Sequence, residues 1–389
     1  MIRLWPAYGT VLFCLILPVS IAGMNIAAGL LTLWIPTALV RGEKLPWRRL
    51  LKPACLALAA YCLAAVIVSL AGVEPTHSIR TLFKDFHKLW MLMILLLALE
   101  KMPAAALTAA LGAGFTVIAA VGLYQSAFLD EGGTWIRAHA FVHPVTYGQQ
   151  MALAWLGSLC LLLKPPLNFP PLWRRILAAF MLLISAAFIL NQTRGAFLGL
   201  AAGFAAIGLL DRRFRRWFGW FLGAAFGLAA IWEFLPTGRS LIGMVRSYGW
   251  SPVHNEQFNR LVFWKTAWRM FFDHPWTGVG VGNYRSIFDR YFQGVVGKQA
   301  AWGSAHNLYL HQLAERGVIG FAALAGLLWA LASRAWKRAR QNPDALNLWA
   351  WGSITAFLVM NLTEVSFQNE QTATLILFIW AWAEVRHER

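Results

Sequence analysis

The sequence is short of charge, and acidic residues are the scarcest: Asp and Glu number 17 among 389 residues, against 34 Lys and Arg. Charged residues make up 13% of the chain, about half the usual share of a soluble globular domain. This excludes an ordinary soluble enzyme, and the 59% apolar content excludes an intrinsically disordered chain. The net charge of +17 would suggest nucleic-acid binding in a soluble protein, so its placement along the chain must be established first.

Cysteine is also scarce, since the chain has four, and all lie inside apolar runs. None has the spacing of a metal ligand, so we interpret them as packing residues. The sequence also lacks a pair of carboxylates spaced for metal-dependent glycosyl or phosphoryl transfer. We therefore expect no metal ion and no cofactor.

Long apolar runs are what the chain has in abundance. A transmembrane helix needs about 20 mostly apolar residues. Twelve runs come close to this length, at residues 4–22, 24–40, 54–72, 84–100, 104–126, 145–163, 176–192, 195–210, 217–235, 318–334, 346–363 and 371–385. The sequence therefore predicts an all-α, polytopic membrane protein with about 12 transmembrane helices.

The placement of charge predicts the orientation of these helices. With the N-terminus in the cytoplasm, the cytoplasmic loops hold 20 basic and six acidic residues, a net charge of +14. This asymmetry follows the positive-inside rule, and an even number of spans returns the C-terminus to the cytoplasm. Most of the positive charge is thus explained by topology, and we expect membrane lipids, not nucleic acid, as its partners.

The longest stretch without a span predicts a large, partly helical periplasmic loop between helices 9 and 10. We expect residues 1–235 to hold transmembrane helices 1–9, residues 236–317 to form a periplasmic loop domain with active-site residues, and residues 318–389 to hold helices 10–12. Within the loop, residues 259–272 and 304–316 read as helices. Loops of this length are usually functional or small domains.

Three residues on the outer side suggest chemistry, and each has a simpler interpretation. Arg194, in a tight turn between two spans, either binds an anion in an outer cavity or reaches to lipid headgroups. Arg260 suits phosphate, and Trp264 on the same helix face either lines a groove for a lipid or sugar or lies on the bilayer. His306 is either a general base or a structural residue on an apolar helix face shared with Leu310 and Leu313.

Several short segments occur in a recognisable order along the chain. They are RLVFW at 260–264, HPWTGVG at 274–280, HNLYL at 306–310, ERG at 315–317, TRGA at 193–196, and the segment 137–147 that holds His143-Pro144. Together with the twelve-span layout and the large late loop, they resemble the O-antigen ligase and polymerase superfamily.

The resemblance implies transfer of a glycan from undecaprenyl diphosphate at the periplasmic face of the Gram-negative inner membrane. In the ligase branch the acceptor is a sugar hydroxyl of the lipid A-core oligosaccharide. His306 matches the family's essential histidine, and Arg194 and Arg260 match its essential arginines. Four more residues are possible substrate-binding residues: Arg137, His143, Trp264 and Tyr309.

Chemistry agrees with these roles, because two arginines can stabilise a diphosphate leaving group without a metal. A histidine can take the proton of the attacking hydroxyl, and direct displacement predicts inversion at the anomeric carbon.

Three other functions stay open. An O-antigen polymerase and a protein O-glycan ligase share the donor chemistry and differ in the acceptor. A polytopic transporter or flippase would also have many spans, but it would be expected to show inverted repeats and interrupted helices at mid-membrane. The sequence shows no internal repeat, and its polar residues concentrate outside the spans.

Overall fold

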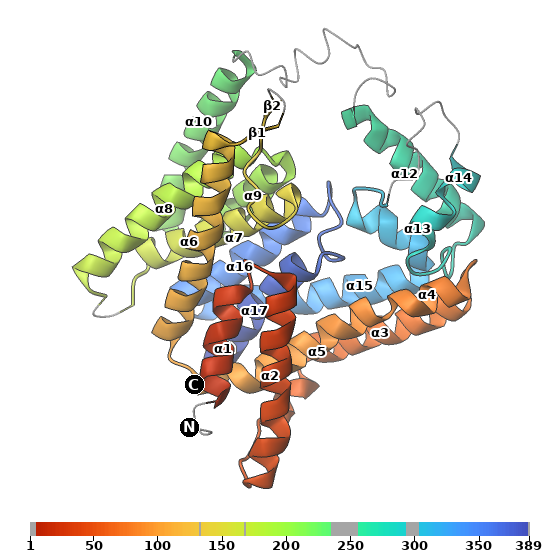
Figure 1. The fold of residues 1–389 in the computed structure, drawn as a ribbon, viewed down its shortest axis with the longest axis horizontal. Coiled ribbons are helices and arrows are strands. Elements are labelled where there is room, and N and C mark those ends of the chain that lie inside the picture. The colour runs from red at the N-terminus through yellow and green to blue at the C-terminus, as the bar shows by residue number, and fades with distance from the viewer. Residues whose placement is uncertain (1–4, 132–133, 167–168, 235–255, 293–302, 388–389) are drawn as a thin grey trace.

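The computed structural model describes residues 5–131, 134–166, 169–234, 256–292 and 303–387, and it is built almost entirely of helices (Figure 1). The first half contains α1 (Trp5–Ile16), α2 (Ile21–Val40), α3 (Pro53–Leu70), α4 (Pro75–Thr81), α5 (Phe83–Ala98), α6 (Ala104–Phe128), α7 (Pro144–Leu163), α8 (Pro171–Asn191) and α9 (Arg194–Leu210). The second half contains α10 (Arg212–Phe234), α12 (Glu256–Asp273), α13 (Asn283–Ser286), α14 (Phe288–Tyr291), α15 (Leu308–Gln341), α16 (Ala345–Met360) and α17 (Glu370–His387).

Short pieces of other structure complete the described chain. Two 3-10 helices, Trp47–Leu51 and Leu99–Lys101, flank the inner ends of α3 and α5. Within the described ranges, β-structure is limited to the two-residue strands β1 (Asp130–Glu131) and β2 (Thr134–Trp135), which pair antiparallel. The expectation of an all-α, polytopic membrane protein is therefore confirmed.

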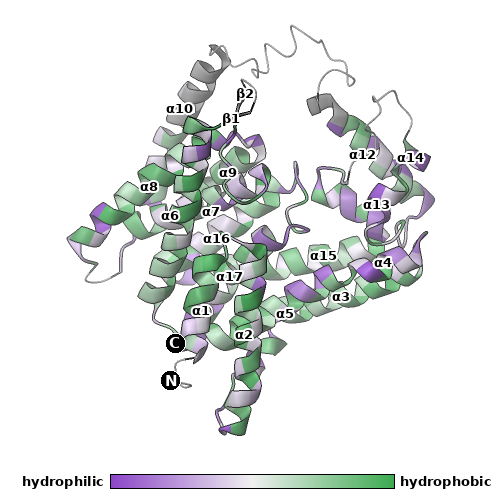
Figure 2. Cartoon of the chain, in the orientation of Figure 1, coloured by the Kyte–Doolittle hydropathy of each residue, from purple (hydrophilic) through white to green (hydrophobic). Residues whose placement is uncertain are grey.

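Each of the twelve ranges predicted as spans falls on a helix. Five helices, α2, α3, α6, α8 and α15, are long and apolar enough to cross a membrane, and α1, α9 and α16 are shorter apolar helices. The first range was too long, because α1 ends at Ile16 and Ser20 begins α2 by accepting a hydrogen bond from the backbone N–H of Gly23. Figure 2 shows the apolar colour over these helices and more polar colour on α4 and on the α12–α14 unit.

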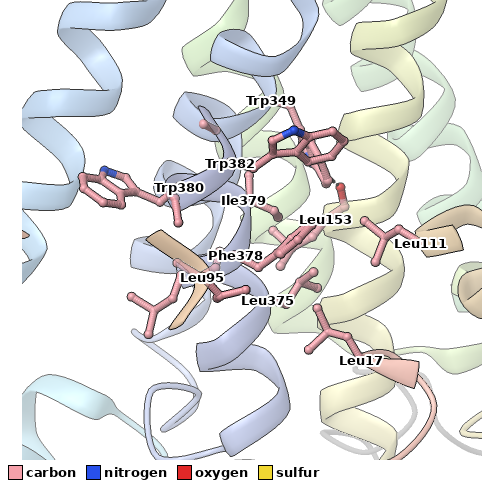
Figure 3. Packing of buried hydrophobic residues seen from close by; sticks show 14 of the residues in the cluster. Leu17, Leu95, Leu111, Leu153, Trp349, Leu375, Phe378, Ile379, Trp380 and Trp382 are labelled. Carbon is pink, nitrogen blue, oxygen red and sulfur yellow. Dashed lines mark hydrogen bonds between the residues drawn. The ribbon is translucent and has the colours of Figure 1, made fainter. Parts of the chain in front are cut away.

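Helix α17 forms the centre of the molecule. Residues 371–385 are all buried, which is the pattern of a helix surrounded by other helices on every side. In Figure 3 its Phe378, Ile379 and Trp382 lie among leucines from other helices and Trp349 of α16. The segment that enters α17, residues 361–369, is therefore held on a rigid core element.

The remaining helices are arranged around this core. Helix α9 packs along α16, and α15 packs along α3 and α12. A second apolar cluster joins α12 to α13 and α14, with Phe263 and Tyr284 among its members. The start of α1 and the end of α17 lie on one side of the molecule, away from the α12–α14 unit (Figure 1).

Helix α15 is one long helix with an interruption at Gly317. This glycine has φ +57° and ψ −161°, and a side chain there would collide with the backbone of Trp276 and Gly278. The backbone N–H of Val318 donates to the carbonyl of Pro275 at 2.8 Å, so the segment after α12 crosses α15 at this point. The interruption separates the start of α15 from the range predicted as a span.

Candidate active site

His306 lies just before α15, not on it. Asn307 is the N-cap of α15, and its side chain accepts a hydrogen bond from the backbone N–H of Leu310 at 3.1 Å. His306 has φ +47°, a left-handed backbone conformation that is uncommon outside glycine. The expected helix from residue 304 is therefore wrong at its start, and the proposed helix face shared with Leu310 does not exist.

The segment around His306 is fixed against the loop that leads into α17. The backbone N–H of Leu308 donates to the carbonyls of Asn361 at 2.9 Å and Glu364 at 3.0 Å. The side-chain amide of Asn307 donates to the carbonyl of Leu362 at 3.0 Å. These bonds bring His306 beside Glu364, although the two residues are 58 positions apart in the sequence.

Glu364 holds two of the predicted site residues at once. One carboxylate oxygen lies 3.2 Å from Nδ1 of His306, and the other accepts a hydrogen bond from Nη2 of Arg260 at 3.0 Å. The Glu364 side chain is 12% exposed, whereas those of His306 and Arg260 are 29% and 36% exposed. The Glu364 carboxylate thus lies at the bottom of the site, and the imidazole of His306 and the guanidinium of Arg260 remain open to a substrate.

Helix α12 positions Arg260 and contributes packing around His306. The ring of Phe263, one turn after Arg260, lies 5.9 Å from the imidazole, centroid to centroid. The hydroxyl of Tyr284 donates to the carbonyl of Phe263 at 3.0 Å, which ties α12 to α13. Trp264 is half-buried on α12.

Arg194 is the first residue of α9, and its side chain is exposed. The next residue, Gly195, lies against the Thr363 side chain so closely that a Cβ at this position would overlap the Thr363 hydroxyl. Thr363 precedes Glu364 in the chain. The start of α9 is thus brought to the same loop that holds His306 and Arg260.

Arg137 fixes the turn before α9. Its Nε donates to the carbonyl of Asn191 at 2.8 Å, and its Nη2 donates to the Thr193 hydroxyl at 2.8 Å. The Asn191 amide in turn donates to the carbonyls of Ala138 and Pro144, both at 2.7 Å. Arg137 therefore supports the turn that presents Arg194.

His143 is the N-cap of α7, and its Nδ1 accepts a hydrogen bond from the backbone N–H of Val145 at 3.3 Å. Partial burial lowers the pKa of His143, while the negative charge of Glu364 opposes this shift. Arg137 and His306 also lower the pKa of His143 through their charges. The segment 137–143 therefore lies within electrostatic reach of the His306–Glu364 pair.

An apolar groove follows α15 from Tyr309, three residues after His306 in the sequence. Its cavity of about 250 Å³ starts at Tyr309 and continues past Leu324 and Leu328 to Ala332, with Leu358 of α16 on the other side. The Tyr309 hydroxyl donates to the carbonyl of Leu358 at 2.8 Å, which joins α15 to α16 at the groove. This α15 groove is suited to an apolar chain.

The ERG segment at residues 315–317 lies in a buried polar cluster. Arg316 donates to Asp85 at 2.7 Å, and Lys88 lies 3.3 Å from the other oxygen of the same carboxylate. Glu315 accepts from the backbone N–H of Tyr284 at 3.3 Å. These buried groups join α15 to α5 and α13 behind the site and do not contact His306.

Residues 179–325 match the model of the O-antigen ligase family. The matched range begins within α8 and ends within α15, so it includes Arg194, Arg260 and His306. This match supports the resemblance of the chain to the O-antigen ligase superfamily. No curated protein gives a significant match to the chain.

At a coarse level, the family match and the long apolar helices support a multi-pass membrane enzyme related to proteins that act on lipid-linked glycans. Sequence reasoning found the two arginines and the histidine but missed Glu364. In the sequence, Glu364 could have been recognised only as an acidic residue in the connection between two apolar runs, on the side of the predicted membrane where the other polar residues gather. Among the described residues, no three His, Cys, Asp or Glu side chains gather as a metal site.

Proposed function

We propose that this protein is an O-antigen ligase, which transfers O-antigen polysaccharide from undecaprenyl diphosphate to a sugar hydroxyl of the lipid A-core oligosaccharide. The reaction takes place at the periplasmic face of a Gram-negative inner membrane, with both termini in the cytoplasm. The observation that carries the proposal is the chain of contacts from Arg260 through Glu364 to His306.

His306 is the general base in this proposal. Glu364 accepts a hydrogen bond from Nδ1–H, which leaves Nε2 as the nitrogen that removes the proton from the acceptor hydroxyl. The acceptor oxygen then forms a bond to the anomeric carbon as the bond from that carbon to the diphosphate breaks. The configuration at the carbon inverts, because a single displacement occurs with no sugar–enzyme intermediate.

Arg194 and Arg260 bind the diphosphate and stabilise its negative charge as it leaves. A guanidinium group offers paired donors that fit phosphate oxygens, so this step needs no metal ion. The α15 groove, which begins at Tyr309, holds the first isoprene units of the polyprenyl chain. The glycan would then extend from the same point into the periplasm.

Gene deletion separates this function from its relatives. Loss of polymer from lipid A-core, with long polymer still on the lipid carrier, is expected of a ligase. Single glycan units on the core would instead identify a polymerase, and normal lipopolysaccharide with an unglycosylated protein acceptor would identify a protein O-glycan ligase.

The chemistry is tested with the purified protein in proteoliposomes. We expect His306→Ala to abolish transfer while donor binding persists, and full activity of this variant would refute the general-base role. We also expect activity to survive EDTA treatment. Activity lost in EDTA and restored by a divalent cation would refute the metal-independent mechanism.

A further inference from the structure

A cavity with basic residues in its wall lies in the α12–α14 unit, and His306 does not line it. Its volume is about 680 Å³, and it lies between the end of α12, α14 and the residues that follow α3. The polar and aromatic residues that matter for its chemistry are Arg269, Phe272, Asp273, His274, Arg290 and Tyr291. We refer to it as the α12–α14 cavity.

The charge of this cavity suits an anion. Arg269 donates from Nη1 to the carbonyl of Tyr291 at 3.1 Å, which holds one guanidinium at the wall. Arg290 is exposed and has no side-chain hydrogen bond or ion pair with any described residue. The single carboxylate, Asp273, is engaged by the Tyr291 hydroxyl, and both burial and this contact raise the pKa of Tyr291. Two guanidinium groups thus face one carboxylate that already has a partner.

The cavity lies beside the end of the apolar helix α3. Val73, three residues after the end of α3, lines the cavity, and its backbone N–H donates to the carbonyl of Val279 at 2.8 Å. Aromatic side chains beside the cavity are exposed, at 71% for Phe272 and 68% for Trp276. Exposed aromatic rings next to basic groups are typical of the boundary between a bilayer and water.

The cavity is distinct from the site that holds the donor diphosphate. Arg260 and Arg269 are nine residues apart on α12, which places them about 13 Å apart along the helix axis and on opposite faces. A ligand in the cavity therefore cannot be the group that Arg260 contacts. It can belong to a larger molecule whose reacting end reaches His306 across several sugar units.

We propose that the α12–α14 cavity binds phosphate groups in the headgroup of the membrane-anchored acceptor glycolipid. This inference rests on the proposed function, because it assigns the acceptor of that reaction a second point of attachment. The guanidinium groups of Arg269 and Arg290 contact the phosphate, and Phe272 contacts the apolar edge of the lipid. The acceptor would thereby be oriented with its sugar hydroxyl toward His306.

Binding of a stated probe tests this proposal. Full-length protein in detergent is titrated with bisphosphorylated lipid A and with the same lipid after removal of its phosphates, and Kd is measured by thermophoresis. We expect Arg290→Gln to weaken binding of the phosphorylated lipid about tenfold, as for loss of one charge-assisted contact. Arg285→Gln, which removes an exposed arginine of α13 outside the cavity, should bind as the wild type does.

Arg269 is tested separately because it also contacts the backbone of Tyr291. We expect Arg269→Gln to weaken the same binding, and an unchanged melting temperature shows that its effect is not unfolding. Equal affinity of the wild type and Arg290→Gln would overturn the proposal, as would equal affinity for the lipid with and without phosphate. Full displacement of the lipid by millimolar inorganic phosphate would also overturn it, since the site would then take free phosphate.

Transfer kinetics separate this proposal from the proposed function. In proteoliposomes, Arg290→Gln should raise the KM for the acceptor with kcat and the donor KM unchanged. If His306→Ala retains transfer but Arg290→Gln loses lipid binding, the assignment of His306 as the general base is wrong and the proposed lipid site stands. If Arg290→Gln lowers kcat with the acceptor KM unchanged, the lipid site is wrong and the proposed function stands.

Discussion

Replacing Glu364 with glutamine removes the negative charge beside His306 while it keeps the size of the side chain. In the proposed reaction, His306 becomes positively charged as it takes the proton from the acceptor hydroxyl. The carboxylate oxygen 3.2 Å away stabilises that charge and keeps Nδ1 as the protonated nitrogen. A glutamine side chain can present its NH₂ group to Nδ1 instead, which would favour the wrong tautomer for a base at Nε2.

The size of the effect follows from the geometry. Two unit charges 3.2 Å apart interact by about 5 kcal/mol at an effective dielectric constant of about 20. The His306 and Glu364 side chains are 29% and 12% exposed, so solvent reduces this value. We take about 2 to 3 kcal/mol as the transition-state stabilisation that is lost, which corresponds to a fall in kcat of roughly 30- to 150-fold.

The assay is transfer of glycan from undecaprenyl diphosphate by purified protein in proteoliposomes, with donor and acceptor varied independently. Asp289→Asn is the matched control, because it removes an exposed acidic residue of α14 that has no contact with His306. We expect Glu364→Gln to lower kcat and the control to leave it unchanged. Wild-type kcat in Glu364→Gln, or an effect confined to the donor KM, would refute the orienting role of Glu364.

Three further substitutions test the donor site, the loop and the buried cluster. Arg260→Ala should raise the Kd for undecaprenyl diphosphate roughly 10- to 150-fold, because a hydrogen bond to a charged group contributes about 1.5 to 3 kcal/mol. Arg260→Lys should restore only part of the lost affinity. Unchanged affinity in direct binding would exclude Arg260 from the diphosphate site. Gly195→Ala should lower kcat by about tenfold or more, because the added Cβ displaces Thr363 and a shift of about 1 Å near catalytic groups can cost about 100-fold. Gly29→Ala, where nothing lies within 4 Å of the added Cβ, is its control, and equal rates in the two variants would contradict the close contact. Arg316→Leu should destabilise the protein by about 3 to 5 kcal/mol, because it leaves the buried carboxylate of Asp85 without its closest partner. A melting temperature equal to that of the wild type would show that the ion pair between Arg316 and Asp85 does not stabilise the fold.

The helices could be predicted from the sequence because each depends on a local property. A run of about 20 apolar residues has few alternatives to a helix in a membrane, since every backbone group must be hydrogen-bonded. The same property predicts α17 without showing that it is central. Its residues 371–385 are buried because other helices surround them, and the apolar content of a lipid-facing helix can be just as high.

The residues of the candidate site could be predicted in part, because each can be recognised from its immediate sequence. The contacts between them could not be predicted in this way. Arg194 and Arg260 stand out as arginines beside apolar runs, and His306 stands out within its segment. Glu364 does not, since its role depends on hydrogen bonds from Leu308 to a loop more than 50 residues later. No spacing rule connects residues that far apart.

The position of His306 before α15 changes what fixes its orientation. The side chain of a histidine within α15 would be oriented by the axis of that helix. The interruption at Gly317 lies further along α15 and would not affect this orientation. Instead, His306 has a left-handed backbone that is unfavourable by about 1 kcal/mol or more and persists because the neighbouring residues hold it. The bonds made by Asn307 and Leu308 fix it to the loop that enters α17, and α17 is buried on every side. The imidazole is therefore positioned by the buried helical core around α17, while Arg260, on the other side of Glu364, is positioned by α12. In the proposed reaction, a donor diphosphate that draws Arg260 toward itself also acts on the partner of His306, because one carboxylate contacts both residues. We therefore expect donor binding and the orientation of His306 to be coupled through Glu364.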